Sequence, residues 1–154
     1  MTEEIESLHK NHTWVLVKRP KTYKIIGCKC VFKKKEGIPG VEDARFKAQL
    51  VAKGFTQREC IDFNEVFSPV VKHSFICILL AIVAQFDLEL EQLDVKTNFL
   101  HDELEEQICI KQLEGFKVQR KEDPVCLLKK SLYGLKQSPR QWYKRFDTFI
   151  LGNG

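Results

Sequence analysis

The sequence predicts an α+β fold, in which an antiparallel hairpin and an incomplete sheet pack on two long helices. Three observations predict this fold. Two runs of alternating apolar and polar residues flank a Gly/Pro turn at 37–40, and the segments 74–87 and 138–151 have helical character. Because strands and helices do not alternate strictly, α+β is favoured over a parallel α/β sheet.

The bulk properties limit the class of protein. The chain has 154 residues, of which 44% are hydrophobic and 30% charged, and this is enough for one domain with a core. The longest apolar run is the ten residues Phe75–Ala84, whereas a bilayer span needs roughly 20. The first ten residues are polar and do not resemble a secretory signal. We therefore expect a protein of the cytoplasm or nucleus, neither secreted nor membrane-bound.

The first predicted element is the hairpin formed by Ile25–Lys33 and Ala44–Ala52. Alternation places apolar side chains on one face and cations on the other, where like charges would oppose one another. A polyanion on the cationic face would relieve this repulsion, which indicates a nucleic acid or a triphosphate. The apolar face comprises Ile26, Cys28, Cys30, Phe32, Phe46, Ala48, Leu50 and Ala52. The cationic face carries Lys29, Lys33, Arg45 and Lys47.

Charge along the chain supports this interpretation. Residues 10–58 hold thirteen Lys and Arg against three acidic residues, residues 59–123 hold six against fourteen, and residues 124–154 hold six against one. A basic beginning, an acidic middle and a basic end suggest different electrostatic roles, although ordinary solvated surface charge is the alternative.

The remaining elements follow in order. Ser74–Asp87 is apolar on nearly every side, which predicts a buried helix with Ser74 as its N-cap. Three strands are predicted next, at Leu88–Val95, Gln107–Ile110 and Val125–Leu128.

The last predicted element is the helix Ser138–Leu151. Ser138 is its expected N-cap, Pro139 its first residue, and Gly152 follows its last turn. Apolar residues recur at helical spacing, so we expect one face to pack. That face comprises Trp142, Phe146, Phe149 and Ile150.

Asp94 is the candidate metal ligand. A carboxylate near the end of a strand is held in direction and stays reachable, as Mg²⁺ binding in phosphoryl transfer requires. A lone Asp at such a place is more often a turn or cap residue. The acidic residues 102–106 are better explained as a solvated face, and the six cysteines and four histidines lack metal-ligand spacing.

Four blocks of the sequence resemble the copia-type reverse transcriptase family, in the order that the family has them. They are AQLVAKGFTQ at 48–57, FSPVVK at 67–72, QLDVKTNFL at 92–100 followed by ELEE at 103–106, and SLYGLKQSPRQWY at 131–143. The resemblance covers nearly the whole chain. It implies a single partial domain over 1–154, with about 10–72 as fingers and about 73–154 as an incomplete palm with a returning fingers segment.

The resemblance also implies roles for individual residues. Asp94 matches the first metal-binding aspartate and Val95 the residue whose backbone carbonyl helps to hold the metal. Phe99 matches the aromatic that excludes a 2′-hydroxyl. Nucleotide binding is implied for Phe99, Arg45, Lys47, Tyr133 and Gly134. Nucleic-acid binding is implied for Lys29, Lys33, Lys53, Lys136, Gln137, Ser138, Pro139 and Arg140.

The family resemblance implies Mg²⁺ or Mn²⁺ as cofactor of the intact enzyme, with a primer–template and dNTPs as partners. The 154 residues contain no Asp-Asp pair, so the family's second motif, Tyr-x-Asp-Asp, is missing, as are the rest of the palm, the thumb and the RNase H segment. Because two-metal catalysis needs several shared carboxylates, we expect this stretch alone neither to bind the metal tightly nor to synthesise DNA.

Two alternatives stay open. The chain could be a nucleic-acid-binding remnant without catalysis, or a degenerate element product without activity. Departures from the family pattern favour the second: Cys30 stands where Trp is usual, Cys77 where Arg is usual, Cys109 where Tyr is usual, and Gln49 where Arg is common.

Overall fold

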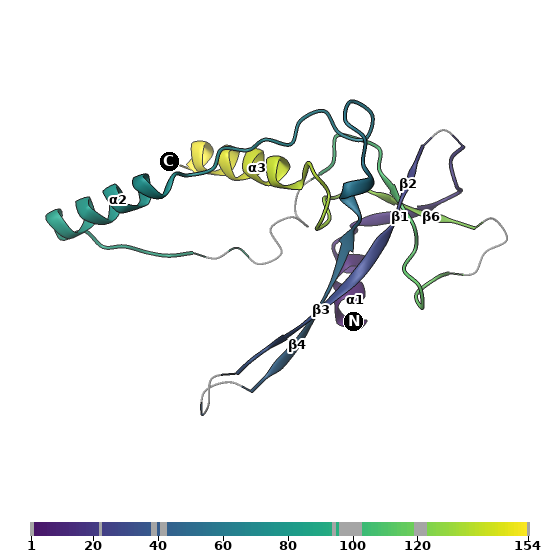
Figure 1. The fold of residues 1–154 in the computed structure, drawn as a ribbon, viewed down its shortest axis with the longest axis horizontal. Coiled ribbons are helices and arrows are strands. Elements are labelled where there is room, and N and C mark those ends of the chain that lie inside the picture. Colours follow the sequence, from purple (N-terminus) through teal and green to yellow (C-terminus); the bar gives the residue numbers. More distant parts are fainter. Residues whose placement is uncertain are drawn as a thin grey trace.

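The computed structural model of the chain describes residues 2–21, 23–37, 40, 43–93, 95, 103–118 and 123–153. It mixes helices and strands, which confirms the α+β class (Figure 1). The elements are α1 (Thr2–Lys10), β1 (Trp14–Val17), β2 (Ile25–Ile26), β3 (Cys28–Lys35), β4 (Arg45–Ala52), the 3-10 helix η1 (Gly54–Thr56), α2 (His73–Phe86), β5 (Cys109–Ile110), β6 (Val125–Leu128) and α3 (Ser138–Asn153).

The strands form two sheets. One has the order β1-β6-β5-β2, in which β6 pairs antiparallel with β1 and β5, and β2 pairs parallel with β5. The other is the hairpin β3–β4, which projects away from the first sheet (Figure 1). The predicted hairpin is confirmed, except that its first run is divided at Gly27 between β2 and β3.

The core lies where the base of the hairpin meets the four-stranded sheet and α1. Leu50 and Ala52 of β4 join Ile26, Ile110 and Leu128 in one buried cluster. Helix α1 was not predicted. Its Ile5 and Leu8 are buried, one helical turn apart, and the carboxylate of Glu4 accepts a hydrogen bond from the Leu50 backbone N–H at 3.2 Å. Their helical spacing was a signal in the sequence, but it covers a single turn.

Helix α2 forms as predicted, but the expectation that it is buried is wrong in this chain. None of its residues is buried, and Figure 1 shows it extending away from both sheets. Its N-cap is Lys72 rather than Ser74, and no side chain caps its first turn. The helix ends at Asp87, which adopts a left-handed conformation with φ of 53°. Among the described residues no helix is both long and apolar enough to cross a bilayer.

The three predicted strands have different outcomes. The strands at 107–110 and 125–128 are confirmed as β5 and β6, the first over two residues only. The prediction for Leu88–Val95 is wrong over residues 88–93, which are irregular and exposed. A strand needs a partner for its backbone groups, and among the described residues none lies beside this segment. Residue 94 lies outside the described part of the chain.

Helix α3 is confirmed, with different ends. Its first intrahelical bond runs from the Gln141 N–H to the Gln137 carbonyl at 3.0 Å, so Gln137 is the N-cap. The Ser138 hydroxyl instead donates to the Leu132 carbonyl at 2.9 Å, which corrects the predicted cap. Gly152 lies inside the helix. The predicted packing face is largely exposed, since Phe146, Phe149 and Ile150 are each more than two-fifths accessible.

Candidate nucleic-acid interface

The hairpin register gathers cations on one face. Cys28 lies opposite Ala52, and successive pairs run outward to Lys35 opposite Arg45. Because neighbouring residues of a strand alternate between faces, Lys29, Lys33 and Lys47 share a face with Lys35 and Arg45. The structure thus brings together the four predicted cations and adds Lys35.

Two of the cross-strand pairs on this face consist of like charges. Lys33 lies opposite Lys47, and Lys35 lies opposite Arg45. Directly opposed cations destabilise a hairpin. All four residues are exposed, so an approaching polyanion can reach them. The outer end of the opposite face carries Phe32, 69% exposed, and Phe46, 80% exposed, with Lys34 opposite Phe46.

The base of the hairpin is joined to the loop that precedes α3. The Ala52 N–H donates to the Tyr133 carbonyl at 2.7 Å, and the Lys53 N–H donates to the Gly27 carbonyl at 2.8 Å. Gly134 has φ of +87°, and a Cβ there would lie 2.3 Å from the Ala52 carbonyl oxygen. A Cβ on Gly54 would lie 1.9 Å from the Gly134 carbonyl oxygen. Two blocks far apart in the sequence therefore meet through backbone contacts that only glycine permits.

Two buried amide side chains complete this junction. Gln57 is 5% exposed and Gln137 is 1% exposed. The Gln57 side chain donates to Oε1 of Gln137 at 2.9 Å and accepts from the Lys136 N–H at 2.9 Å. The Gln137 amide donates in turn to the Asp62 carbonyl at 3.2 Å. Since buried polar groups are costly unless hydrogen-bonded, this network makes the two segments one unit.

The structure separates the predicted nucleic-acid residues of the loop into two kinds. The side chains of Gln137 and Ser138 are buried and hydrogen-bonded inside the protein, so they shape the loop rather than face solvent. Lys136 and Pro139 are exposed, and the ammonium of Lys136 lies 4.7 Å from the centre of the Phe63 ring. Lys53, at the hairpin base, is half-buried.

Cations at the start of α3 are paired with carboxylates from other segments. Arg140 forms an ion pair with Glu65, and the ammonium of Lys144 lies 2.7 Å from Oε1 of Glu105. The hydrogen bond from Lys144 lowers the pKa of the Glu105 carboxyl. The acidic cluster is thus not only a solvated face.

The predicted metal site lies mostly outside the described residues. Asp94 and Phe99 lie outside the described residues, and Val95 is described as exposed and irregular. Within the described part of the chain no group of His, Cys, Asp and Glu could hold a metal ion. The roles of Asp94, Val95 and Phe99 therefore stay predictions.

None of the six cysteines, all of which lie in the described part of the chain, forms a disulfide. Cys126 is the most strongly perturbed: burial, with smaller contributions from Cys28 and Cys109, raises its pKa from 9.0 to about 12. Tyr133 also has a raised pKa, chiefly because of burial.

The raised pKa of the Cys126 thiol predicts that the stability of the protein depends on pH. Between pH 9.0 and about 12 the Cys126 thiol ionises in the unfolded chain while it stays neutral in the folded protein. The free energy of unfolding should therefore fall as pH rises through this window, and the thiol should have no effect below it. Urea unfolding against pH measures the slope, and Cys126→Ala should make it shallower. Equal slopes for the two proteins would contradict the prediction.

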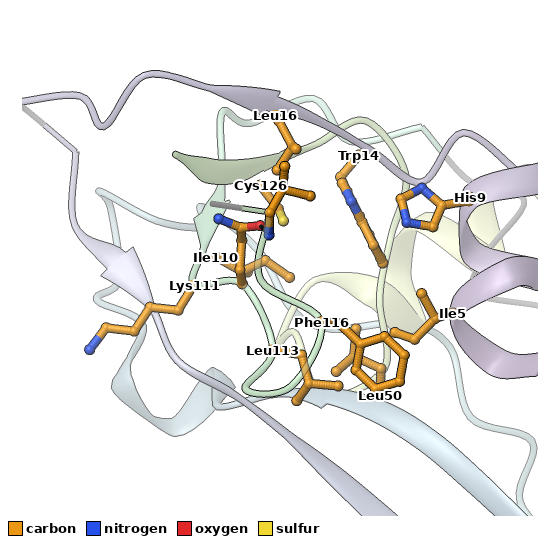
Figure 2. Close-up of a pocket in the computed structure, with 12 residues that line it drawn as sticks. Ile5, His9, Trp14, Leu16, Leu50, Ile110, Lys111, Leu113, Phe116 and Cys126 are labelled. Atoms are coloured by element: carbon orange, nitrogen blue, oxygen red, sulfur yellow. Dashed lines mark hydrogen bonds between the residues drawn. The ribbon is translucent and has the colours of Figure 1, made fainter. Parts of the chain in front are cut away.

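The chain also has a small apolar cavity, away from the cationic face. It has a volume of about 40 Å³ and lies between α1, β1 and the segment 111–118. Figure 2 shows His9 and Trp14 on one side and Leu113 and Phe116 on the other, with the Lys111 side chain directed away. The rings of His9 and Trp14 are 5.2 Å apart in an edge-to-face arrangement. His9, Lys111 and Gln112 are the polar residues of a lining that is otherwise mainly apolar.

Comparison with known proteins decides the family. Residues 11–153 match the family described as reverse transcriptase (RNA-dependent DNA polymerase). The chain belongs to this family. It is 56% identical over 151 residues to the retrovirus-related Pol polyprotein from transposon TNT 1-94 of Nicotiana tabacum, covering 97% of this chain and 11% of that protein. No solved structure matches the chain.

Two relatives from Arabidopsis thaliana agree. The retrovirus-related Pol polyproteins from transposons RE2 and RE1 are each 41% identical over 155 residues, covering all of this chain. That stretch is 11% of the first and 10% of the second. The chain thus corresponds to a short reverse transcriptase segment and spans about a tenth of the length of these copia-type polyproteins.

Sequence reasoning missed several residues that hold the segments of this candidate site together. Gln57 and Gly54 lie in one of the quoted blocks, yet their contacts are with residues about 80 positions away. Glu65 and Glu105 gave no individual signal, because an ion pair between distant segments has no local pattern.

Proposed function

We propose that the chain supplies the fingers hairpin and the first metal-binding carboxylate of an RNA-directed DNA polymerase from a copia-type retrotransposon. In this proposal Arg45 and Lys47 hold the triphosphate, and the cationic face holds the primer–template. Fingers comprise about residues 10–72, and about 73–154 form an incomplete palm with a returning fingers segment.

The observation that carries the proposal is the junction between the hairpin and the Tyr133–Gly134 loop. The Tyr133 carbonyl accepts from the last residue of β4, so the loop lies at the base of the hairpin. A nucleic-acid backbone whose phosphates are held by Lys29 and Lys33 would therefore run toward Tyr133. A strand rises about 3.3 Å per residue, so the cationic face extends roughly 20 Å from this loop.

Catalysis requires more than these residues. Asp94, with the Val95 carbonyl, would hold one Mg²⁺ or Mn²⁺, which polarises phosphate oxygens when bound. Two-metal chemistry needs further carboxylates, and no Asp-Asp pair occurs among the 154 residues. We infer that the second carboxylate motif belongs to another part of the polyprotein.

The exposed apolar surfaces of α2 and α3 support this inference. Leu79 and Phe86 of α2, with Phe149 of α3, are each more than half exposed. Apolar helix faces of this extent normally lie against other protein. The remaining palm and thumb of a longer polyprotein are the proposed partners.

Primer extension tests whether catalysis needs carboxylates from outside these 154 residues. The 154-residue chain with Mg²⁺, dNTPs and a primed RNA template should give no product, because one carboxylate cannot position both metals. Robust extension by the chain alone would contradict the prediction.

A chimaera serves as the matched control. Replacing the corresponding stretch of the tobacco relative by this chain should give extension, and Asp94→Asn in the chimaera should abolish it. If the unmodified tobacco protein extends the primer and the chimaera does not, residues such as Cys30 and Cys109 have inactivated the segment, and the degenerate-element alternative holds.

A second candidate function is nucleic-acid binding without catalysis. The opposed cations Lys33 and Lys47 favour it, since their repulsion is relieved by a bound polyanion. It predicts affinity that falls steeply with salt, whatever the outcome of primer extension.

A further inference from the structure

The carboxylate of Glu105 lies among donor groups of α3. The ammonium of Lys144 is 2.7 Å from its Oε1, the side chain of Gln141 donates a hydrogen bond to it, and the charge of Arg140 acts on it. Arg140 and Lys144 are four residues apart and therefore neighbours on one helix face. Gln141 is only 7% exposed, so this polar group is fixed toward its anionic partner.

A groove adjoins this carboxylate. It has a volume of about 530 Å³ and lies between α3 and the segment that holds Glu103 and Glu105. Lys144, Arg145 and Thr148 line the helix side, and the two glutamates line the other side. One wall therefore offers donors to an anion, and the facing wall supplies an anion of its own.

A carboxylate and a phosphodiester present the same chemistry to these donors, because both accept charge-assisted hydrogen bonds through anionic oxygens. The Glu105 side chain is 62% exposed and that of Lys144 is 41% exposed. Ion pairs as exposed as this one are weak, so a strand bound across the groove can displace the glutamate.

We propose that Gln141 and Lys144 form a phosphate-binding site for a nucleic-acid strand, and that Glu105 occupies this site as an internal competitor. The neighbouring guanidinium of Arg140 adds positive charge, but it is itself paired with Glu65. The inference rests on the proposed function, of which it specifies a second contact with nucleic acid beyond the hairpin. The ion pair with Lys144 holds the competitor in place until a phosphate replaces it.

Fluorescence anisotropy with a labelled single-stranded oligothymidylate tests the site. Glu105→Gln removes the competing charge and frees Lys144 for one phosphate. One added contact on a single strand should raise the binding constant about eightfold at ~50 mM salt and about fourfold at ~150 mM, with a salt slope steeper by about 0.7. Adding Lys144→Gln to this variant should remove the gain.

Glu103→Gln is the matched control, because it removes the same charge from the same groove wall. If Glu103→Gln raises affinity as much as Glu105→Gln, general charge explains the effect and the inference fails. If the wild-type chain binds the oligonucleotide and Glu105→Gln binds it no more tightly, the inference is overturned. The proposed function is then unaffected. No binding by any variant at ~50 mM salt would overturn both. Glu105→Asp keeps the charge on a shorter side chain and should give an intermediate gain in affinity. This variant tests the inference if Glu105→Gln fails to fold.

Discussion

Alanine at position 134 is expected to destabilise the protein by about 2–5 kcal/mol, which is a fall in Tm of roughly 5–15 °C. Two effects contribute. Gly134 has φ of +87°, a conformation that strains any residue with a Cβ, and its added Cβ would lie 2.3 Å from the Ala52 carbonyl oxygen and 2.6 Å from Val51 Cγ1. Either the loop or β4 must move, and the Ala52–Tyr133 hydrogen bond would be lost with that movement.

Other glycines allow the two effects to be separated by thermal unfolding. Gly115→Ala isolates backbone strain, since Gly115 has φ of +84° but nothing within 4 Å of its Cβ position. Gly54→Ala isolates the steric clash with the Gly134 carbonyl. Gly152→Ala has neither, lies in α3, and should leave Tm unchanged or raise it slightly.

The expected order of loss is Gly134→Ala, then the two single-effect variants, then Gly152→Ala. A Tm for Gly134→Ala equal to that of Gly115→Ala would mean that the loop does not contact β4. The junction on which the proposed function depends would then be wrong.

The second large effect is expected from reversing two charges on the hairpin. Arg45→Glu with Lys47→Glu should weaken binding to a single-stranded oligonucleotide more than about 50-fold at ~50 mM salt, because two phosphate contacts are lost and two repulsive charges gained. The salt slope should become shallower by about 1.4. Anisotropy titrations at several salt concentrations measure both quantities.

The same double variant should keep or raise the Tm. Each introduced carboxylate would lie opposite a lysine, because position 47 faces Lys33 and position 45 faces Lys35, so attraction replaces repulsion across the strands. Loss of binding therefore cannot be ascribed to unfolding. Lys21→Glu with Lys117→Glu changes net charge equally at exposed sites off the hairpin and is the control. Equal losses in both double variants would contradict a specific cationic face.

These predictions concern two parts of one surface. The cationic hairpin is specified by alternation along β3 and β4, and the loop joined to its base is specified by contacts across about 80 residues. Reversing charge on the hairpin should weaken nucleic-acid binding without lowering the Tm. Alanine at Gly134 in the loop should instead lower the Tm.

The sequence alone determined the family, the mixed fold class, the hairpin with its cationic face, and the approximate positions of α2 and α3. Each of these depends on residues close together in the chain. A period of two predicts a strand run at Ile25–Lys33, and the structure has β2 and β3 there. Helical spacing predicts a helix at Ser138–Leu151, and the structure has α3 at Ser138–Asn153.

Only the tertiary structure decided which predicted surfaces are covered and which polar groups are used internally. It placed α1 on β4, left α2 exposed, buried Gln57 against Gln137, and paired Lys144 with Glu105. The physical reason is that burial and ion pairing depend on what the rest of the chain brings near a residue. The same apolar helix is core in one assembly and surface in another, and its own residues do not specify the partner.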